Sequence, residues 1–170
     1  MNANCAKALV SFVPLYHLPS MHIEIDQSGK VEETNRITVI AFSNHITRAV
    51  VIPAAVKREC IEYLRRQGRN KQTFVFQIFA AGIFCLIEEY LHQLEHVAID
   101  TEYPGRDGDI KGMLLNAILR VESDFPKQRI SFKQVGKKSG CHFKAYGVFT
   151  GRQKADRVLS VEDILNALGK

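Results

Sequence analysis

The amino-acid sequence predicts a single α/β domain built on a mixed β-sheet with helices packed on its faces. Between residues 21 and 53, three apolar runs are separated by short polar turns, which predicts a meander of three strands. Beyond residue 53, helical patterns alternate with short apolar runs, which favours strands joined through helices. The length of 170 residues and the hydrophobic share of 46% suit one domain with a substantial core.

The N-terminal third predicts an arm followed by the meander. Residues 1–20 are expected to form an irregular arm or a short strand. The first strand of the meander alternates apolar and polar residues, ends at Asp26 and is followed by a turn at Gly29. We expect it to form an antiparallel hairpin with the second strand. The three strands are expected over residues 21–26, 36–44 and 48–53.

Two helices are expected in the middle of the chain. Pro53 suits the first turn of a helix, where its missing N–H costs nothing, and this helix runs to about Gln67 and ends at Gly68. A more apolar helix follows, from about Thr73 to Leu94. Gly82 weakens the interior of that helix by roughly 1 kcal/mol, so we expect it to permit a close approach to the sheet.

The second half alternates between strands and helices. Asp109 is expected to cap one helix, and Ser160 the last, where Asp163 three residues on resembles a capping box. Gly169 ends that last helix. The expected elements are strands over residues 96–100 and 129–135 and helices over residues 109–120, 139–149 and 160–169.

Cysteine usage and hydropathy bear on location. The four cysteines are isolated and form no C-x-x-C pair, which argues against a zinc cluster and favours buried thiols in a reducing compartment. The longest apolar stretch, residues 74–87, is too short to span a bilayer. The N-terminus lacks the pattern of a secretory signal. We therefore expect a cytoplasmic protein that does not associate with membranes.

Basic residues are concentrated near the C-terminus. Residues 127–157 carry a net charge of +8, whereas the whole chain carries +5, so the remainder is at −3. A second basic cluster lies near residues 58–71, at the end of the first predicted helix. Such clusters suit a polyanion such as nucleic acid, although a solvated surface is the better interpretation of each lysine taken alone.

Two predicted strands each deliver a carboxylate at their ends. Asp26 ends the first strand in "IEIDQSGK", and Asp100 ends the fourth in "VAIDTEY". Glu102 follows two residues later, so it faces the same side as Asp100 if the strand continues. These acids suit turns as well, because aspartate favours turns. If the two strands are neighbours, the acids instead form one metal site.

This order of elements and acids resembles the ribonuclease H-like superfamily, which includes ribonucleases H and Holliday-junction resolvases. The resemblance covers about residues 20–157 and implies a mixed five-stranded sheet with helices on both faces, in which strand four lies parallel to strand one. It implies that Asp26 and Asp100 meet at a metal, and that the helix containing His142 reaches the same site. The family often has a glutamate near the start of the central helix, where this chain has Gln77. Junction-cutting members form dimers, so a homodimer is possible here.

The resemblance predicts a metal-dependent nuclease that acts on DNA or RNA. Asp26, Asp100 and Glu102 would hold Mg²⁺ or Mn²⁺, both of which favour oxygen ligands. His142 would transfer a proton or orient water, although it also suits a plain helix surface. The predicted nucleic-acid contacts are Lys137, Lys138, Ser139, Lys144, Arg152 and Lys154.

Several alternatives remain open. A nucleic-acid-binding module that has lost catalysis is consistent with Gln77, because an amide adds no negative charge. A partner-binding protein with a basic surface and no ligand is a further possibility. His92 and His96, four residues apart, could bind a metal, but a solvated helix end explains them as well. The run Ser28-Gly29-Lys30 lacks the upstream glycine of a phosphate-binding loop, which excludes a nucleoside triphosphatase of that type.

Overall fold

The computed structural model describes residues 20–68 and 70–170, and this part of the chain forms one six-stranded sheet. Apart from Ser20, the expected N-terminal arm lies outside the described residues. The strands follow each other across the sheet in the order β5-β4-β1-β2-β3-β6. They are β1 (Met21–Ser28), β2 (Thr38–Ser43), β3 (Thr47–Ile52), β4 (Leu94–Asp100), β5 (Ile130–Lys133) and β6 (Arg157–Val158).

The sheet is mixed, as the sequence predicts. β1, β2 and β3 form an antiparallel meander. β4 pairs in parallel with β1, and β5 pairs in parallel with β4. The expected number of five strands is wrong by one, because β6 adds to the edge of β3 in parallel. With two residues, β6 is too short for hydrophobic periodicity to reveal it.

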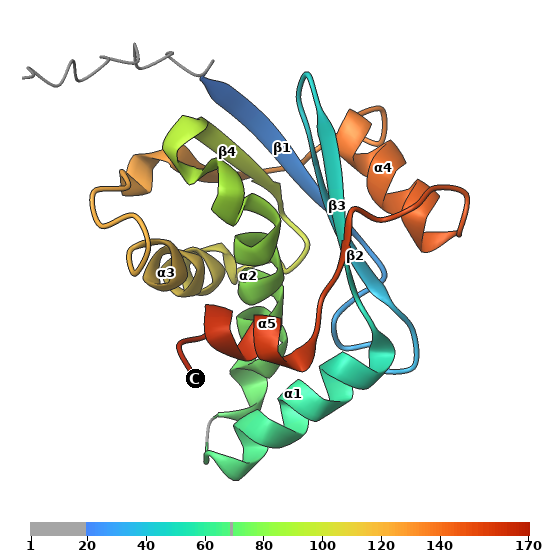
Figure 1. The fold of residues 1–170 in the computed structure, drawn as a ribbon, viewed down its shortest axis with the longest axis vertical. Helices are drawn as coiled ribbons and strands as arrows, with labels where there is room; N and C mark the ends of the chain where they lie inside the picture. Colours follow the sequence, from blue (N-terminus) through green and yellow to red (C-terminus); the bar gives the residue numbers. More distant parts are fainter. Residues whose placement is uncertain (1–19, 69) are drawn as a thin grey trace, which may run out of the picture.

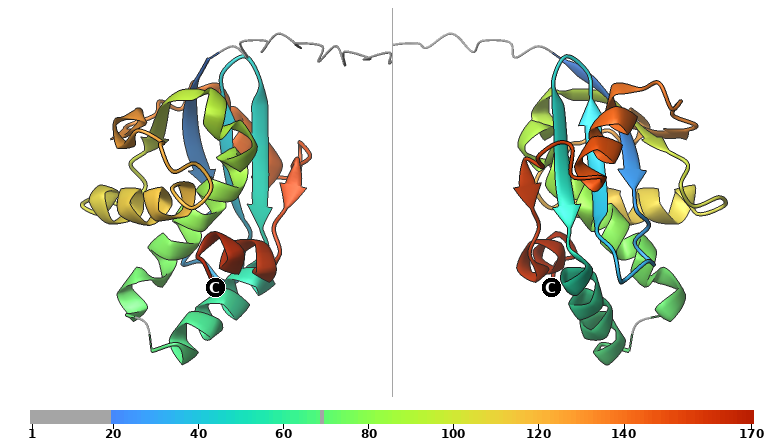
Figure 2. Two further views of the ribbon diagram at one scale, coloured as in Figure 1. Left: turned by 60° about the vertical axis from the view of Figure 1, so that its left-hand side comes forward. Right: turned by 90° about the vertical axis from the view of Figure 1, so that its right-hand side faces the viewer.

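Helices cover both faces of the sheet, in unequal number (Figure 1). On one face lie α1 (Ala54–Arg66), α2 (Phe74–Ile87), α3 (Asp107–Ile118) and α5 (Val161–Ala167). α4 (Gly140–Phe149) lies on the opposite face, against β1, β2 and β3. The views in Figure 2 show the same separation of α4 from the other helices. The α/β class with helices on both faces is therefore confirmed.

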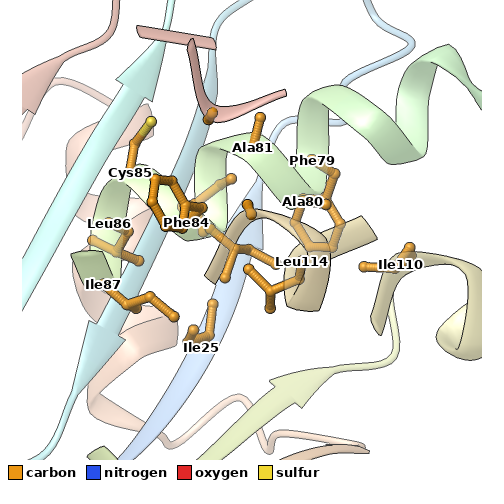
Figure 3. Close-up of a cluster of buried hydrophobic side chains, with 14 of the residues drawn as sticks. Ile25, Phe79, Ala80, Ala81, Phe84, Cys85, Leu86, Ile87, Ile110 and Leu114 are labelled. Atoms are coloured by element: carbon orange, nitrogen blue, oxygen red, sulfur yellow. The ribbon is translucent and has the colours of Figure 1, made fainter. Parts of the chain in front are cut away.

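The main core is built around α2. Its side chains pack against Ile25 of β1 and against Ile110 and Leu114 of α3 (Figure 3). Gly82 permits close contact with the sheet, because a Cβ atom there would lie 2.7 Å from Ile40 Cδ1 and 2.9 Å from Ile52 Cδ1. The packing role expected for this glycine is thus confirmed.

The helical segment around α2 ends differently from the prediction. α2 stops at Ile87, and Glu88–Gln93 continue as a 3-10 helix instead of extending an α-helix to Leu94. Together, Phe74–Gln93 are long and apolar enough to cross a membrane by length and composition. However, 67% of the most apolar window is buried inside the protein, as in the core helix of a water-soluble fold.

Two helix starts test the capping predictions. α5 has the expected capping box, in which Ser160 Oγ accepts from the Asp163 backbone N–H and the Asp163 side chain accepts from the Ser160 N–H. The cap predicted at Asp109 is wrong, because α3 begins two residues earlier and Arg106 occupies the N-cap position. Asp109 instead lies in the first turn and forms an ion pair with Arg106 at 3.2 Å.

A second, smaller core lies between α4 and the sheet. Its buried members are Val39, Ala41, Ala49, Val51, Ala145 and Val148. Because side chains alternate along a strand, β1 sends Ile25 into the main core and Asp26 toward α4. Cys60, Cys85 and Cys141 are buried free thiols, and burial raises the pKa of Cys60 and Cys85 to about 12. The cysteines that the structure describes thus match the expectation of buried thiols.

Candidate metal centre

The carboxylates of Asp26, Asp100 and Glu102 converge at the ends of β1 and β4. The two strands are adjacent and parallel, and the last residue pair of their ladder, Ile25 with Ile99, directly precedes the two aspartates. One carboxylate oxygen from each of the three acids lies within 4.8 Å of the others. The expected proximity of Asp26 and Asp100 is therefore found, and the arrangement offers hard oxygen ligands to a divalent cation.

Asp26 is held in place by two hydrogen bonds. Its side chain is only 6% exposed. Asp26 Oδ1 accepts from the Gln27 backbone N–H at 2.8 Å, and Oδ2 lies 2.8 Å from His142 Nδ1. Since an ionised carboxylate can only accept, Nδ1 of His142 carries the hydrogen in this pair. The contact fixes the orientation of the imidazole and brings α4 to the metal centre.

Asp100 links the centre to the segment after β5. Its Oδ1 accepts from the Val135 backbone N–H at 2.5 Å. The Thr101 N–H donates to the Lys133 carbonyl at 3.2 Å, so the chain leaving β4 stays close to the end of β5. These contacts hold the Asp100 carboxylate at the C-terminal end of β4.

Glu102 reaches the centre by a turn. β4 ends at Asp100, and the Glu102 N–H donates to the Asp100 carbonyl at 2.9 Å, which closes a tight turn over Thr101. The strand therefore does not continue through Glu102, which was the condition for Glu102 to face the same side as Asp100. The turn nevertheless places the Glu102 carboxylate beside both aspartates.

The pKa of Glu102 is raised to about 8. Burial is the largest cause, followed by the negative charges of Asp26 and Asp100, while the nearby charge of Lys30 opposes the rise. A metal-free centre therefore keeps a proton on the carboxylate cluster at neutral pH. A bound cation would lower the pKa of Glu102 and release this proton, because its positive charge offsets the repulsion among the three carboxylates.

A fourth carboxylate, Glu24, lies on the same face of β1 and was missed at the sequence level. Lys133 Nζ donates to Glu24 Oε1 at 2.7 Å, and Ser139 Oγ donates to Oε2 at 2.8 Å. These two hydrogen bonds lower the pKa of Glu24. The signal was present in the sequence, because Glu24 and Asp26 are two residues apart on one strand.

The predicted nucleic-acid contacts lie in α4 and at its two ends. Lys144 is partly buried and contacts the segment that precedes β6. Its Nζ donates to the Lys154 carbonyl at 3.0 Å and lies 3.5 Å from Asp156 Oδ2. Arg152 and Lys154 are exposed beyond the C-terminal end of α4, whereas Lys137 and Lys138 are exposed in the loop before it. Ser139 precedes α4, but its hydroxyl is bonded to Glu24.

Two other candidates lie away from the centre. Gln77 Nε2 donates to Thr73 Oγ1 at 3.1 Å, and Gln77 lines a cavity with Met113 of α3. It is therefore on the α2 face of the sheet, while Asp26 faces α4. His92 and His96 do not share a helix, because His92 lies in the 3-10 segment and His96 belongs to β4. The Nε2 atom of His96 lies 3.0 Å from Ser131 Oγ. The shared helix on which both interpretations of this pair depended is therefore not found.

Comparison with known proteins gives no further guidance: no protein-family model, no curated protein and no solved structure matches this chain.

Proposed function

We propose that the protein is a metal-dependent nuclease of the ribonuclease H-like type, which hydrolyses phosphodiester bonds of DNA or RNA. The observation that carries this proposal is the convergence of three carboxylate oxygens within 4.8 Å at two adjacent strand ends. The antiparallel meander with β4 parallel to β1 supports it, because the resemblance implies that arrangement.

Asp26, Asp100 and Glu102 would hold Mg²⁺ or Mn²⁺. When bound there, such ions supply an activated water and stabilise the leaving oxygen of the phosphodiester. Asp26 holds His142 through Nδ1, so the Nε2 atom of the imidazole can transfer a proton to or from the reacting oxygens. Burial and the neighbouring carboxylates raise the pKa of Glu102, and it would lose its proton when the site is loaded, because the charge of a cation favours the ionised carboxylate.

The proposal includes a location and a partner. Nucleic acid is the partner, in keeping with the net charge of +5. The buried free thiols in the described part of the chain suit a reducing compartment such as the cytoplasm. A homodimer stays a prediction.

Asp26→Asn and Asp100→Asn test the proposal directly. Titration calorimetry with Mn²⁺ and Mg²⁺ should show binding to the wild type, and each variant should bind at least about 100-fold more weakly, because a direct ligand is lost. Labelled single-stranded, duplex, hybrid and junction substrates should be cut by the wild type with either ion and left intact in EDTA. Asp109→Asn, an exposed carboxylate on α3, is the matched control and should behave as the wild type. Unchanged ion binding and cleavage in both Asp variants would remove the proposal.

The second candidate function is a nucleic-acid-binding module without catalysis. It is favoured by Gln77, which contributes no carboxylate and is bonded to Thr73 on the other face of the sheet. This candidate predicts affinity for nucleic acid that falls steeply with salt, together with no cleavage in Mg²⁺ or Mn²⁺. Affinity that is absent would leave only a partner-binding protein with a basic surface.

A further inference from the structure

Two large aromatic side chains on α4 are exposed next to the metal centre. Phe143 is 58% exposed and Tyr146 is 47% exposed. The Tyr146 ring lies parallel to the His142 ring, with an interplanar angle of 3° and centroids 6.3 Å apart. Because His142 is bonded to Asp26, an aromatic surface extends outward from the carboxylates.

Tyr146 also forms one wall of a groove of about 270 Å³. Phe149 and the turn that follows β1 complete the lining, and this turn contributes Lys30 and Arg36. The Arg36 guanidinium lies 4.8 Å above the centre of the Phe149 ring. A volume just below the roughly 300–1,000 Å³ of typical small-molecule sites suits a unit the size of one nucleotide.

The groove is fixed by the fold. Gly29 adopts a φ of 74°, and a Cβ atom there would overlap the Ile37 carbonyl oxygen and the Phe149 ring. Lys57 Nζ donates to the carbonyl oxygens of Lys30 and Glu33 at 3.0 and 2.8 Å, so α1 holds the turn from below. The walls are therefore preorganised, which reduces the entropy lost on binding.

The charges that line the groove favour an anion. Lys30 and Arg36 are exposed and positive, whereas Glu33 is the acid among the lining residues, so the lining is net positive. An exposed aromatic face beside two cations is the combination by which proteins bind unpaired bases and their phosphates. A base inside a duplex has both faces covered by its neighbours and cannot stack on Tyr146.

We propose that this groove binds an unpaired nucleotide, with its base stacked on Tyr146 and its phosphate held by Lys30 and Arg36. The proposal rests on the proposed nuclease function and narrows its substrate to a single-stranded or locally unpaired strand. The strand would run from the groove past His142 to the carboxylates, so that the phosphodiester that is cut lies on the side of the stacked nucleotide opposite to the phosphate held by Lys30 and Arg36.

Fluorescence anisotropy in EDTA tests the binding step without cleavage. The probes are a labelled single-stranded oligonucleotide and a blunt hairpin duplex of the same composition. Tyr146→Ala should weaken single-strand binding by about five- to 150-fold, the effect of losing one base–aromatic stack. Tyr146→Phe should retain it, and hairpin binding should be unchanged in both variants. Circular dichroism establishes that each variant is folded.

Phe143→Ala is the matched control, because Phe143 is more exposed and lies on the same helix but is not part of the groove lining. It should bind the single strand as the wild type does. Arg36→Gln should reduce the slope of log affinity against log salt by about 1. Lys170→Gln, which changes an exposed lysine beyond α5 and outside the groove lining, should leave that slope unchanged.

Three results would overturn the groove proposal: no single-strand binding by the wild type, equal loss in Phe143→Ala and Tyr146→Ala, or no loss in Tyr146→Ala. Different results would overturn the proposed nuclease function. If binding depends on Tyr146 but no substrate is cut in Mg²⁺ or Mn²⁺, the groove proposal stands and the nuclease proposal falls. If duplex is cut and the Tyr146 substitutions do not change cleavage, the nuclease proposal stands and the groove proposal falls.

Discussion

Glu102 makes the protein's stability depend on pH. Burial and two neighbouring aspartates raise the pKa of its carboxyl to about 8, whereas in the unfolded chain it ionises near its ordinary value of 4.5. A group with a raised folded-state pKa contributes stability that is present below its unfolded pKa and is lost as pH rises through the folded pKa. For the metal-free protein this window runs from about pH 4.5 to pH 8.

Glu102→Gln should therefore stabilise the metal-free protein at alkaline pH. At pH 8.5 in EDTA we expect a melting temperature at least about 2–4 °C above that of the wild type, which corresponds to about 1 kcal/mol for a chain of this size. At pH 4.5 the two proteins should melt alike, because Glu102 is protonated in the folded wild type. Thermal melts followed by circular dichroism across this range measure the difference.

The same variant should respond less to metal. Added Mn²⁺ should raise the melting temperature of the wild type more than that of Glu102→Gln, because the stability that a ligand adds to the folded state grows with the logarithm of its affinity. Glu122→Gln, which lies beyond α3 and outside the centre, controls for the loss of one acid. An equal response of both variants to Mn²⁺ and pH would contradict the assignment of Glu102.

Individual site residues were predicted from the sequence where regular structure positions them. Asp26 and Asp100 end two strands, and strand order brings them together. Glu102 was included, but its approach through a turn depends on one backbone hydrogen bond that no periodicity encodes. Tyr146 was missed, because its significance comes from stacking on His142 and from the groove beside it.

At the scale of elements, α1 anchors the turn between β1 and β2 through one buried lysine. Lys57 is fully buried, and its Nζ donates to the Lys30 and Glu33 carbonyls and to Thr38 Oγ1. Burial lowers the pKa of Lys57 to about 8. The ammonium replaces the solvent that these backbone acceptors would otherwise bind.

Lys57→Met should destabilise the protein and loosen this turn. The loss is expected to be about 2–4 kcal/mol in urea denaturation, because buried carbonyl acceptors are left without donors. Hydrogen exchange should become faster for the amides of residues 30–38. Arg58→Met is the control, since Arg58 bonds the Thr34 carbonyl at an exposed position and should change stability by less than about 0.5 kcal/mol. A similar effect of both variants would show that Lys57 is not the anchor.

Elements with long, regular patterns were predicted more closely than their ends. The cap of α5 was found because its residues follow a fixed spacing. The start of α3 was missed because Arg106, a residue without capping preference, occupies the N-cap, while Asp109 two residues inside the helix matches the pattern better. The 3-10 segment after α2 keeps helical spacing in the sequence, so its change of geometry is not visible there.

At the scale of the molecule, the distance between α2 and the sheet is set at Gly82. Gly82→Ala should destabilise the protein by about 1–2 kcal/mol, because strain against two buried isoleucines outweighs the gain in helix propensity. Replacing Ile40 and Ile52 by valine removes both obstructing Cδ1 atoms. In that background, Gly82→Ala should cost less or become stabilising.

A double-mutant cycle in urea measures this coupling. An identical cost of Gly82→Ala in both backgrounds would mean that the Cδ1 atoms do not set the spacing. Ile23→Val, in β1 outside this contact, supplies a core truncation that should not relieve the strain.

The α/β class could be predicted because it follows from the order of periodic segments. The unequal cover of the two faces could not, because the sequence does not show which face of the sheet a crossover helix takes. The edge strand β6 depends on tertiary pairing with β3 and leaves Val158 exposed, so it carries no hydrophobic signature.

The placement of α4 has an evolutionary consequence. Asp26 and Asp100 arise from strands that are anchored in the large core, and Glu102 follows β4 by a tight turn. His142 and Tyr146, by contrast, are carried by one helix that rests on a small, separate cluster. In the proposed enzyme, the residues that bind the cation and the residues that select the nucleic-acid strand thus rest on different hydrophobic cores. Substitutions along the outer side of this helix would then change which nucleic acids bind without altering the three carboxylates.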